Sequence, residues 1–203
     1  MLYYLTQFSD GGDVFNLFRY LTFRSGGAFF TALFIGFLFG RPVINQLRKR
    51  QKMGQPIRDD GPERHLLEKA GTPTMGGVLI LMSLAVATLL WARWDNGYVW
   101  MVLLVTLGFG AIGFADDFMK VSKFNTKGVP GRVRLGLGFA IAALAALATM
   151  YMHDEALSGH LAFPVFKDLL LNLSVLFIPF AMIVIVGAAN SVNLTDGLDG
   201  LAI

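Results

Sequence analysis

The chain has 203 residues, no cysteine and a formal net charge of +3. Apolar residues make up 55% of it and charged residues only 15%, whereas soluble domains carry about a quarter charged residues. Together with a mean hydropathy of +0.58, this excludes an ordinary soluble domain and indicates an integral membrane protein. The lack of cysteine excludes disulfides and thiolate metal sites.

Five apolar segments follow one another along the chain, at about residues 21–40, 74–92, 98–115, 133–152 and 173–190. Each is close to the length that crosses the hydrocarbon core of a bilayer. Because backbone groups inside hydrocarbon must be hydrogen-bonded within their own segment, we expect all of them to be helices. The predicted fold class is all-α, a polytopic transmembrane helix bundle with about five spanning helices, as a single domain over residues 1–203. Glycines such as Gly27, Gly36 and Gly110 are expected at close helix–helix contacts.

Most of the 17 basic residues lie in two connecting segments, residues 41–74 and 116–134. Basic loops stay on the cytoplasmic side, so the N-terminus is predicted outside and Ile203 inside. Residues 41–52 form an expected short amphipathic helix that rests on anionic lipid headgroups. A further apolar segment begins just before Ile203, so we expect a chain truncated at its C-terminal end.

Asp116 and Asp117 follow the third apolar segment. Carboxylates at the mouth of a membrane helix are costly to keep there and mark a functional site by default. Neighbouring residues on a helix point about 100° apart, so one Asp can bind a metal or act as a base while the other orients Lys120. The alternative is a solvated pair that ends a helix, which the negative partial charge of a helix C-terminus disfavours. Lys127, in the basic loop that follows, is a second candidate phosphate ligand.

The run Asn190-x-x-Asn193-x-x-Asp196-Gly-Leu-Asp199-Gly follows the fifth apolar segment. Spacing of three places Asn190, Asn193 and Asp196 along one face of a continuing helix. Oxygen donors of this kind suit a hard cation such as Mg²⁺, which prefers carboxylates together with substrate phosphates. An ordinary turn rich in Asn and Asp is the alternative.

A third motif, Lys69-Ala-Gly-Thr72-Pro-Thr74-Met-Gly-Gly77, precedes the second apolar segment. Its glycines and threonines are compatible with backbone N–H groups that approach an anion at a helix N-terminus. A loop–helix junction with Pro73 near the start of the helix explains the same residues.

Along the chain the Lys69–Gly77 motif comes first, then Asp116-Asp117-x-x-Lys120, then the run from Asn190 to Gly200. In this order, the three motifs resemble those of the polyprenyl-phosphate N-acetylhexosamine-1-phosphate transferases. The Gly-Thr-Pro-Thr-Met-Gly-Gly run is typical of the phospho-N-acetylmuramoyl-pentapeptide transferase branch, and the resemblance covers essentially the whole chain. It implies the N-terminal half, or slightly more, of a ten-helix bacterial inner-membrane enzyme with a cytoplasmic active site. Such an enzyme transfers phospho-MurNAc-pentapeptide from UDP-MurNAc-pentapeptide to undecaprenyl phosphate, with Mg²⁺, giving lipid I and UMP in peptidoglycan synthesis.

The resemblance also implies residue roles. Asp116 and Asp117 would be catalytic, Asp117 and Asn193 candidate metal ligands, and Lys120 a phosphate ligand. The remaining implied substrate-binding residues are Lys69, Thr72, Lys127, Asn190, Asp196, Gly197, Leu198 and Asp199. The family's third catalytic Asp and its His-containing loop lie beyond Ile203, so this chain alone is expected to be inactive. Phe118 stands where the family usually has Tyr, and Arg134 where it usually has Lys, which puts any role of Arg134 in doubt.

Two rival functions stay open. A GlcNAc-1-phosphate transferase of the same superfamily would use UDP-GlcNAc instead. A membrane transporter also places acids in its helices, but usually near the bilayer midplane rather than at one side. Membrane lipid and a possible homodimer are further expected partners, and nucleic acid is not.

Overall fold

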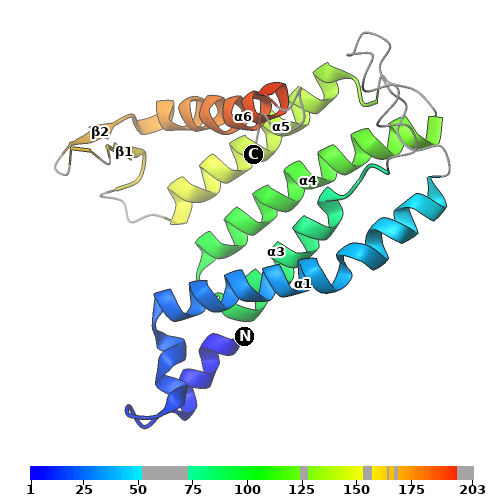
Figure 1. Cartoon of the computed structure of the whole chain (residues 1–203). Helices are drawn as coiled ribbons and strands as arrows, with labels where there is room; N and C mark the ends of the chain where they lie inside the picture. The colour runs from blue at the N-terminus through cyan, green and yellow to red at the C-terminus, as the bar shows by residue number, and fades with distance from the viewer. Residues whose placement is uncertain (52–72, 124–127, 153–156, 164, 167–168, 196–203) are drawn as a thin grey trace. The chain divides into compact units, whose positions relative to one another are not determined.

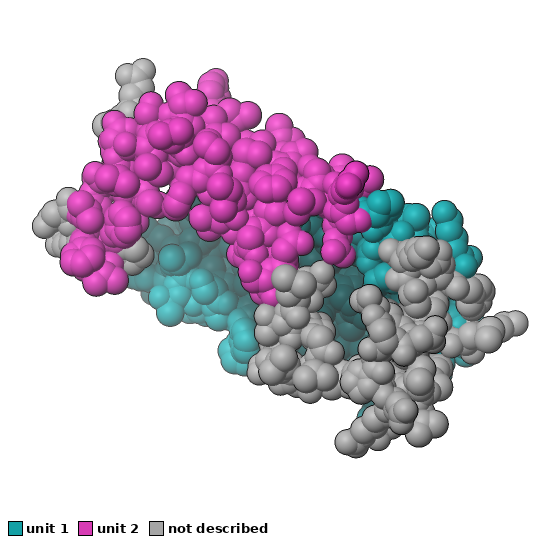
Figure 2. All heavy atoms as spheres, turned by 90° about the horizontal axis from the view of Figure 1, so that it is seen from above, with its two compact units in different colours: residues 1–130 teal, residues 131–203 magenta. Residues whose placement is uncertain are grey.

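A computed structural model describes residues 1–51, 73–123, 128–152, 157–163, 165–166 and 169–195. They belong to two compact units, residues 1–130 and 131–203, which Figure 2 shows in teal and magenta. Helices dominate both units, and the helical segments coincide with the apolar runs of the sequence.

Unit 1 opens with two 3₁₀ helices, η1 (Leu2–Phe8) and η2 (Val14–Arg19). The α-helices that the structure describes in this unit are α1 (Leu21–Arg50), α3 (Gly77–Trp91) and α4 (Gly97–Lys123). Helix α1 packs against α3, and α3 packs against α4 (Figure 1). Successive helices run in opposite directions, so the ends of α1 and α4 meet the start of α3.

The described part of unit 2 contains two helices that pack against each other and a small hairpin that lies between them in the sequence (Figure 1). The helices are α5 (Gly131–Met152) and α6 (Phe177–Thr195), the latter preceded by η3 (Ser174–Leu176). Strands β1 (His160–Ala162) and β2 (Leu170–Asn172) pair antiparallel, with His160 opposite Asn172.

The helices have the lengths and surfaces of membrane spans. Four of them are long and apolar enough to cross a bilayer: Leu21–Arg50, Gly97–Lys123, Gly131–Met152 and Ser174–Val192. Helix α3 is equally apolar but has 15 residues. The buried apolar side chains are mostly small, whereas many Phe and Leu side chains are exposed, as expected where lipid replaces water. The predicted all-α, multi-pass membrane fold is confirmed.

Two helix boundaries differ from the prediction. Helix α1 continues through Pro42 to Arg50, so residues 41–50 are not a separate amphipathic helix. A proline removes one backbone donor, and the rest of the helix remains bonded around it. Helix α4 continues past its apolar run to Lys123, because Asp116 and Lys120 form an ion pair one turn apart on it. The alternative of a solvated Asp pair that ends a helix is therefore excluded, since Asp116 is buried and α4 continues beyond it.

Two of the glycines mark close helix contacts. A Cβ at Gly27 would collide with the ring of Trp91, and one at Gly110 would collide with Leu81. These positions let α1 and α4 approach α3, as predicted. Gly36 has nothing within 4 Å of its Cβ position, so the same prediction is wrong there.

Candidate functional site

The candidate site lies in unit 1, where three parts of the chain meet beside the last turns of α4. Helix α4 supplies Asp116, Asp117 and Lys120. The segment before α3 supplies Thr74, and residues 128–130, the turn after α4, supply the backbone N–H of Val129. The structure thus joins the second half of the Lys69–Gly77 motif to the Asp pair, which are more than 40 residues apart in the sequence.

Asp116 is buried, with 7% of its surface exposed. Its Oδ1 accepts a hydrogen bond from the Val129 N–H at 2.8 Å, and its Oδ2 lies 2.5 Å from Lys120 Nζ. A buried carboxylate is stable only when it is paired and hydrogen-bonded, and both oxygens meet that condition. Asp116 therefore holds Lys120 and the turn after α4 in place.

Gly128 allows the turn to come this close. Its φ is +56°, in the left-handed region where glycine has no Cβ penalty. A Cβ there would collide with the Asp116 carboxylate and lie 2.9 Å from Lys120 Cε. The turn after α4 can come close enough to hydrogen-bond Asp116 only because residue 128 is a glycine.

Asp117 has a more open environment, with 31% of its side chain exposed. Its Oδ2 accepts a hydrogen bond from the Thr74 hydroxyl at 2.8 Å. Its Oδ1 lies 3.8 Å from Lys120 Nζ, farther than the oxygen of Asp116. Lys120 thus contacts both carboxylates but pairs closely with Asp116, which leaves Asp117 as the carboxylate that an incoming ligand can reach.

Thr74 is held by Gln51, the residue that follows α1. Gln51 is 7% exposed, and its side-chain amide makes two hydrogen bonds to the Thr74 backbone. Sequence reasoning missed Gln51, because a single Gln after a basic helix carries no motif. It also assigned nothing to Gly128, although Gly128 and the nearby Pro130 are residue types common in turns.

The other predicted residues are placed less fully. Seven of them lie outside the described residues: Lys69, Thr72, Lys127, Asp196, Gly197, Leu198 and Asp199. The side chain of Asn193 also lies outside them, although its backbone is in α6. Asn190 lies on α6 in unit 2, where its Nδ2 donates to the Val186 carbonyl at 2.8 Å. The meeting of the Asn/Asp motif with the Asp pair therefore stays a prediction.

Among the described residues, no group of three or more His, Asp or Glu side chains is close enough to form a metal cage. Mg²⁺ does not need one, because it keeps several waters and binds one or two carboxylates together with substrate phosphates. The half-exposed carboxylate of Asp117 suits this mode of binding, whereas Asp116 is engaged through both oxygens.

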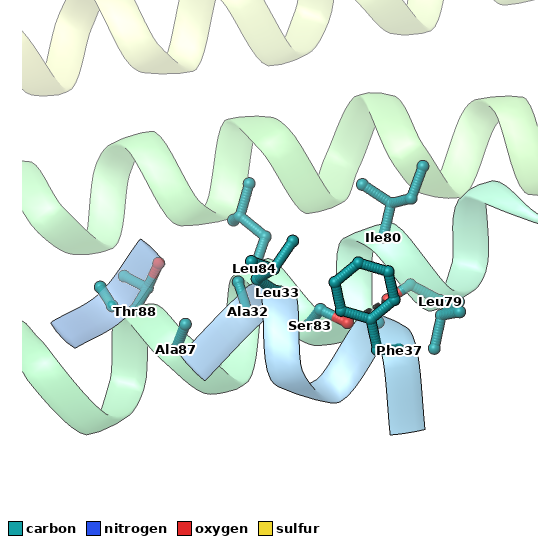
Figure 3. A pocket seen from close by; sticks show the side chains of 11 residues that line it. Ala32, Leu33, Phe37, Leu79, Ile80, Ser83, Leu84, Ala87 and Thr88 are labelled. Carbon is teal, nitrogen blue, oxygen red and sulfur yellow. Dashed lines mark hydrogen bonds between the residues drawn. The ribbon is translucent and has the colours of Figure 1, made fainter. Parts of the chain in front are cut away.

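A separate groove runs between α1 and α3 and has a volume of about 510 Å³ (Figure 3). Small and apolar side chains line it, including Ala32, Phe37 and Leu84, and its polar lining is limited to Ser83 and Thr88. The Ser83 hydroxyl is already bonded to the Leu79 carbonyl at 2.8 Å. A lining without charge does not suit a phosphate-rich ligand, so the groove is not the site for the chemistry of the Asp pair.

Comparison with known proteins gives matches along the whole chain. Residues 99–203 match the family Glycosyl transferase family 4, and residues 69–81 match Phospho-N-acetylmuramoyl-pentapeptide-transferase signature 1. Over 203 residues the chain is 70% identical to the phospho-N-acetylmuramoyl-pentapeptide-transferase of Dinoroseobacter shibae. It is 68% identical to the enzymes of that name from Ruegeria pomeroyi and another Ruegeria strain. These alignments cover 100% of this chain but 56% of each relative, so the chain spans about half the length of the curated relatives it matches.

Proposed function

This chain belongs to glycosyl transferase family 4, as the N-terminal portion of a phospho-N-acetylmuramoyl-pentapeptide transferase, and on that premise we propose its activity and its site. The protein that contains it transfers phospho-MurNAc-pentapeptide from UDP-MurNAc-pentapeptide to undecaprenyl phosphate, forming lipid I and UMP. One observation carries the proposal: the Thr74 hydroxyl donates to Asp117 at 2.8 Å. Thr74 lies in the matched signature and Asp117 in the matched family region, so both matched segments contribute to one acid–lysine site.

The proposed reaction is a phosphoryl transfer. An oxygen of undecaprenyl phosphate attacks the sugar-bearing phosphorus of the UDP-sugar, and the bond from that phosphorus to the bridging oxygen of the diphosphate breaks. The electron pair leaves with UMP. Catalysis of such a step consists mostly of positioning and charge stabilisation. A monoester phosphate has a second pKa near 6, so the acceptor is largely a dianion at neutral pH and needs orientation more than a strong base.

The two carboxylates take different roles in this proposal. Asp116 is buried and holds Lys120, whose ammonium draws in phosphate oxygens. Asp117 is the reachable carboxylate, and it orients the acceptor phosphate or removes its residual proton. Lys127 is a second proposed phosphate ligand. The direct route requires no covalent bond to Asp117; a phosphorylated enzyme trapped in a single turnover without acceptor would contradict it.

The metal proposal follows from the donors available. Asp117, together with Asn193 and a ligand from the rest of the protein, would hold Mg²⁺, which would neutralise charge on the diphosphate. Among the implied substrate-binding residues, Lys69 and Asp196 to Asp199 would hold the uridine of the nucleotide, with Thr72 and Asn190 near them. The end of unit 1 that carries this site is proposed to face the cytoplasm of a bacterial inner membrane, because basic side chains cluster there.

The proposal is tested with the purified full-length protein in lipid nanodiscs. We expect UMP release and lipid I formation from UDP-MurNAc-pentapeptide and undecaprenyl phosphate, dependent on Mg²⁺. Asp117→Asn should lower turnover by about a thousandfold, because a neutral amide cannot replace the carboxylate. A preference for UDP-GlcNAc as donor would instead favour the related GlcNAc-1-phosphate transferase activity.

A further inference from the structure

The side chain of Gln51 joins two distant parts of unit 1 at the candidate site. Its Nε2 donates to the Thr74 carbonyl at 3.2 Å, and its Oε1 accepts from the Thr74 N–H at 2.9 Å. The backbone N–H of Gln51 donates in turn to the Leu47 carbonyl at 2.8 Å, which anchors the residue to the end of α1. A buried amide that bonds both backbone groups of one residue fixes that residue in position and orientation.

Few side chains can replace such an amide. Donor and acceptor are both used here, and only Gln and Asn carry the two on one carboxamide group. Glu would keep the acceptor and lose the donor, whereas Leu would lose both. Since Gln51 is 7% exposed, either change would leave a backbone group of Thr74 without its partner beside a buried side chain.

The backbone beside Thr74 needs this support. Met75 has a φ of 70°, a left-handed conformation that is strained for a non-glycine residue. Such a conformation persists only when surrounding contacts determine it, and it occurs more often at functional sites than elsewhere. The two bonds from Gln51 to Thr74 lie directly beside Met75 and help to hold the backbone there.

We propose that Gln51 is a positioning residue for Asp117, which it orients through Thr74. Because Gln51 hydrogen-bonds both backbone groups of Thr74, it directs the Thr74 hydroxyl toward Asp117 Oδ2, 2.8 Å away. The same two hydrogen bonds connect the residues on either side of segment 52–73, which contains Lys69 and Thr72. The inference rests on the proposed function, since Asp117 is taken there as the carboxylate that meets substrate.

Steady-state kinetics of the full-length protein test the proposal. In Gln51→Leu and Gln51→Glu, kcat should fall about tenfold or more, with KM for both substrates changed less than about threefold, because Asp117 is misoriented while the substrates still bind. Gln46→Leu is the matched control, since Gln46 is an exposed glutamine in the last turns of α1, just before Gln51, and it should leave kcat unchanged. Wild-type kcat in both Gln51 variants would overturn the proposal.

A double-mutant cycle separates positioning from a general effect on folding. Thr74→Val removes the hydroxyl, and Thr74→Ser keeps it and should retain most of the wild-type kcat. If Gln51 acts through that hydroxyl, the Gln51→Leu/Thr74→Val double variant should be no slower than Thr74→Val alone. Losses that multiply would overturn the proposal, because Gln51 would then act independently of Thr74.

Amide hydrogen exchange supplies a readout that needs no substrate. The Thr74 N–H should exchange faster in Gln51→Leu than in wild type, and Gln46→Leu should not differ from wild type. Unchanged exchange in Gln51→Leu, in a protein whose wild type makes lipid I, would overturn the inference and leave the proposed function standing. A well-folded wild type that makes no lipid I would contradict the proposed function and, with it, the role given to Gln51.

Discussion

Lys120 lies between two carboxylates at unequal distances, 2.5 Å from Asp116 and 3.8 Å from Asp117. The sequence predicted this group of three, because an acidic pair and a lysine one turn later belong on one side of a helix. It left open which Asp orients the lysine and which meets a ligand. Burial decides between them, since Asp116 is enclosed by the turn after α4 and Asp117 is partly exposed.

Replacement of Lys120 by Met tests the buried pair. The change leaves Asp116 without its ammonium partner, which typically costs about 3 kcal/mol when a pair is buried. We therefore expect a clear loss of thermal stability together with at least a hundredfold loss of turnover. Thermal unfolding and UMP release would be measured on the same preparation. Lys123→Met is the control: Lys123 is exposed on the same turns of α4, and its loss should affect stability little.

At the scale of elements, the site depends on how α4 ends and where the chain goes next. The apolar run of α4 stops at the Asp pair, but the helix continues to Lys123, and the backbone N–H of Val129, farther along the chain, bonds Asp116. Hydropathy detects the end of an apolar run and not the end of a helix. The continuation is stabilised by polar pairs along the last turns, which a hydropathy pattern does not weigh.

Gly128→Ala tests the close approach of the turn after α4 to Asp116. The new Cβ meets the Asp116 carboxylate and Lys120 in addition to the strain of a positive φ, so we expect a loss of about 2 kcal/mol or more and a strong loss of turnover. Gly11→Ala separates the two causes, because Gly11 also has a positive φ, +94°, but nothing within 4 Å of its Cβ position. Equal effects of the two substitutions would mean that the collision with Asp116 does not matter.

At the scale of the whole molecule, the distribution of charge predicts the orientation in the membrane. Basic residues fill the last turns of α1 and α4, at the end of unit 1 that carries the Asp pair. The opposite end includes the turn between α3 and α4, where Arg93 and Asp95 form an exposed ion pair. Because basic segments remain in the cytoplasm, the Asp pair is expected inside.

Single cysteines test this orientation directly, because the chain contains none of its own. A membrane-impermeant thiol reagent should label Gly12→Cys in intact spheroplasts and should label Lys123→Cys only after the membrane is opened. Both positions are exposed, so differences in labelling report the side of the membrane rather than burial. The reverse pattern would place the Asp pair outside and contradict the proposed cytoplasmic reaction.

The sequence by itself determined the class of the protein, the approximate helices, and the family, since apolar run length and motif order are local properties of the chain. It also singled out Asp116, Asp117 and Lys120. Only the tertiary structure showed that Thr74 hydrogen-bonds Asp117 and that Gln51 hydrogen-bonds the Thr74 backbone. It also showed that Gly128 allows the backbone beside it to approach Asp116 closely. These contacts join residues far apart in the sequence, and their strength depends on burial and hydrogen-bond geometry, which arise only when the helix ends are brought together.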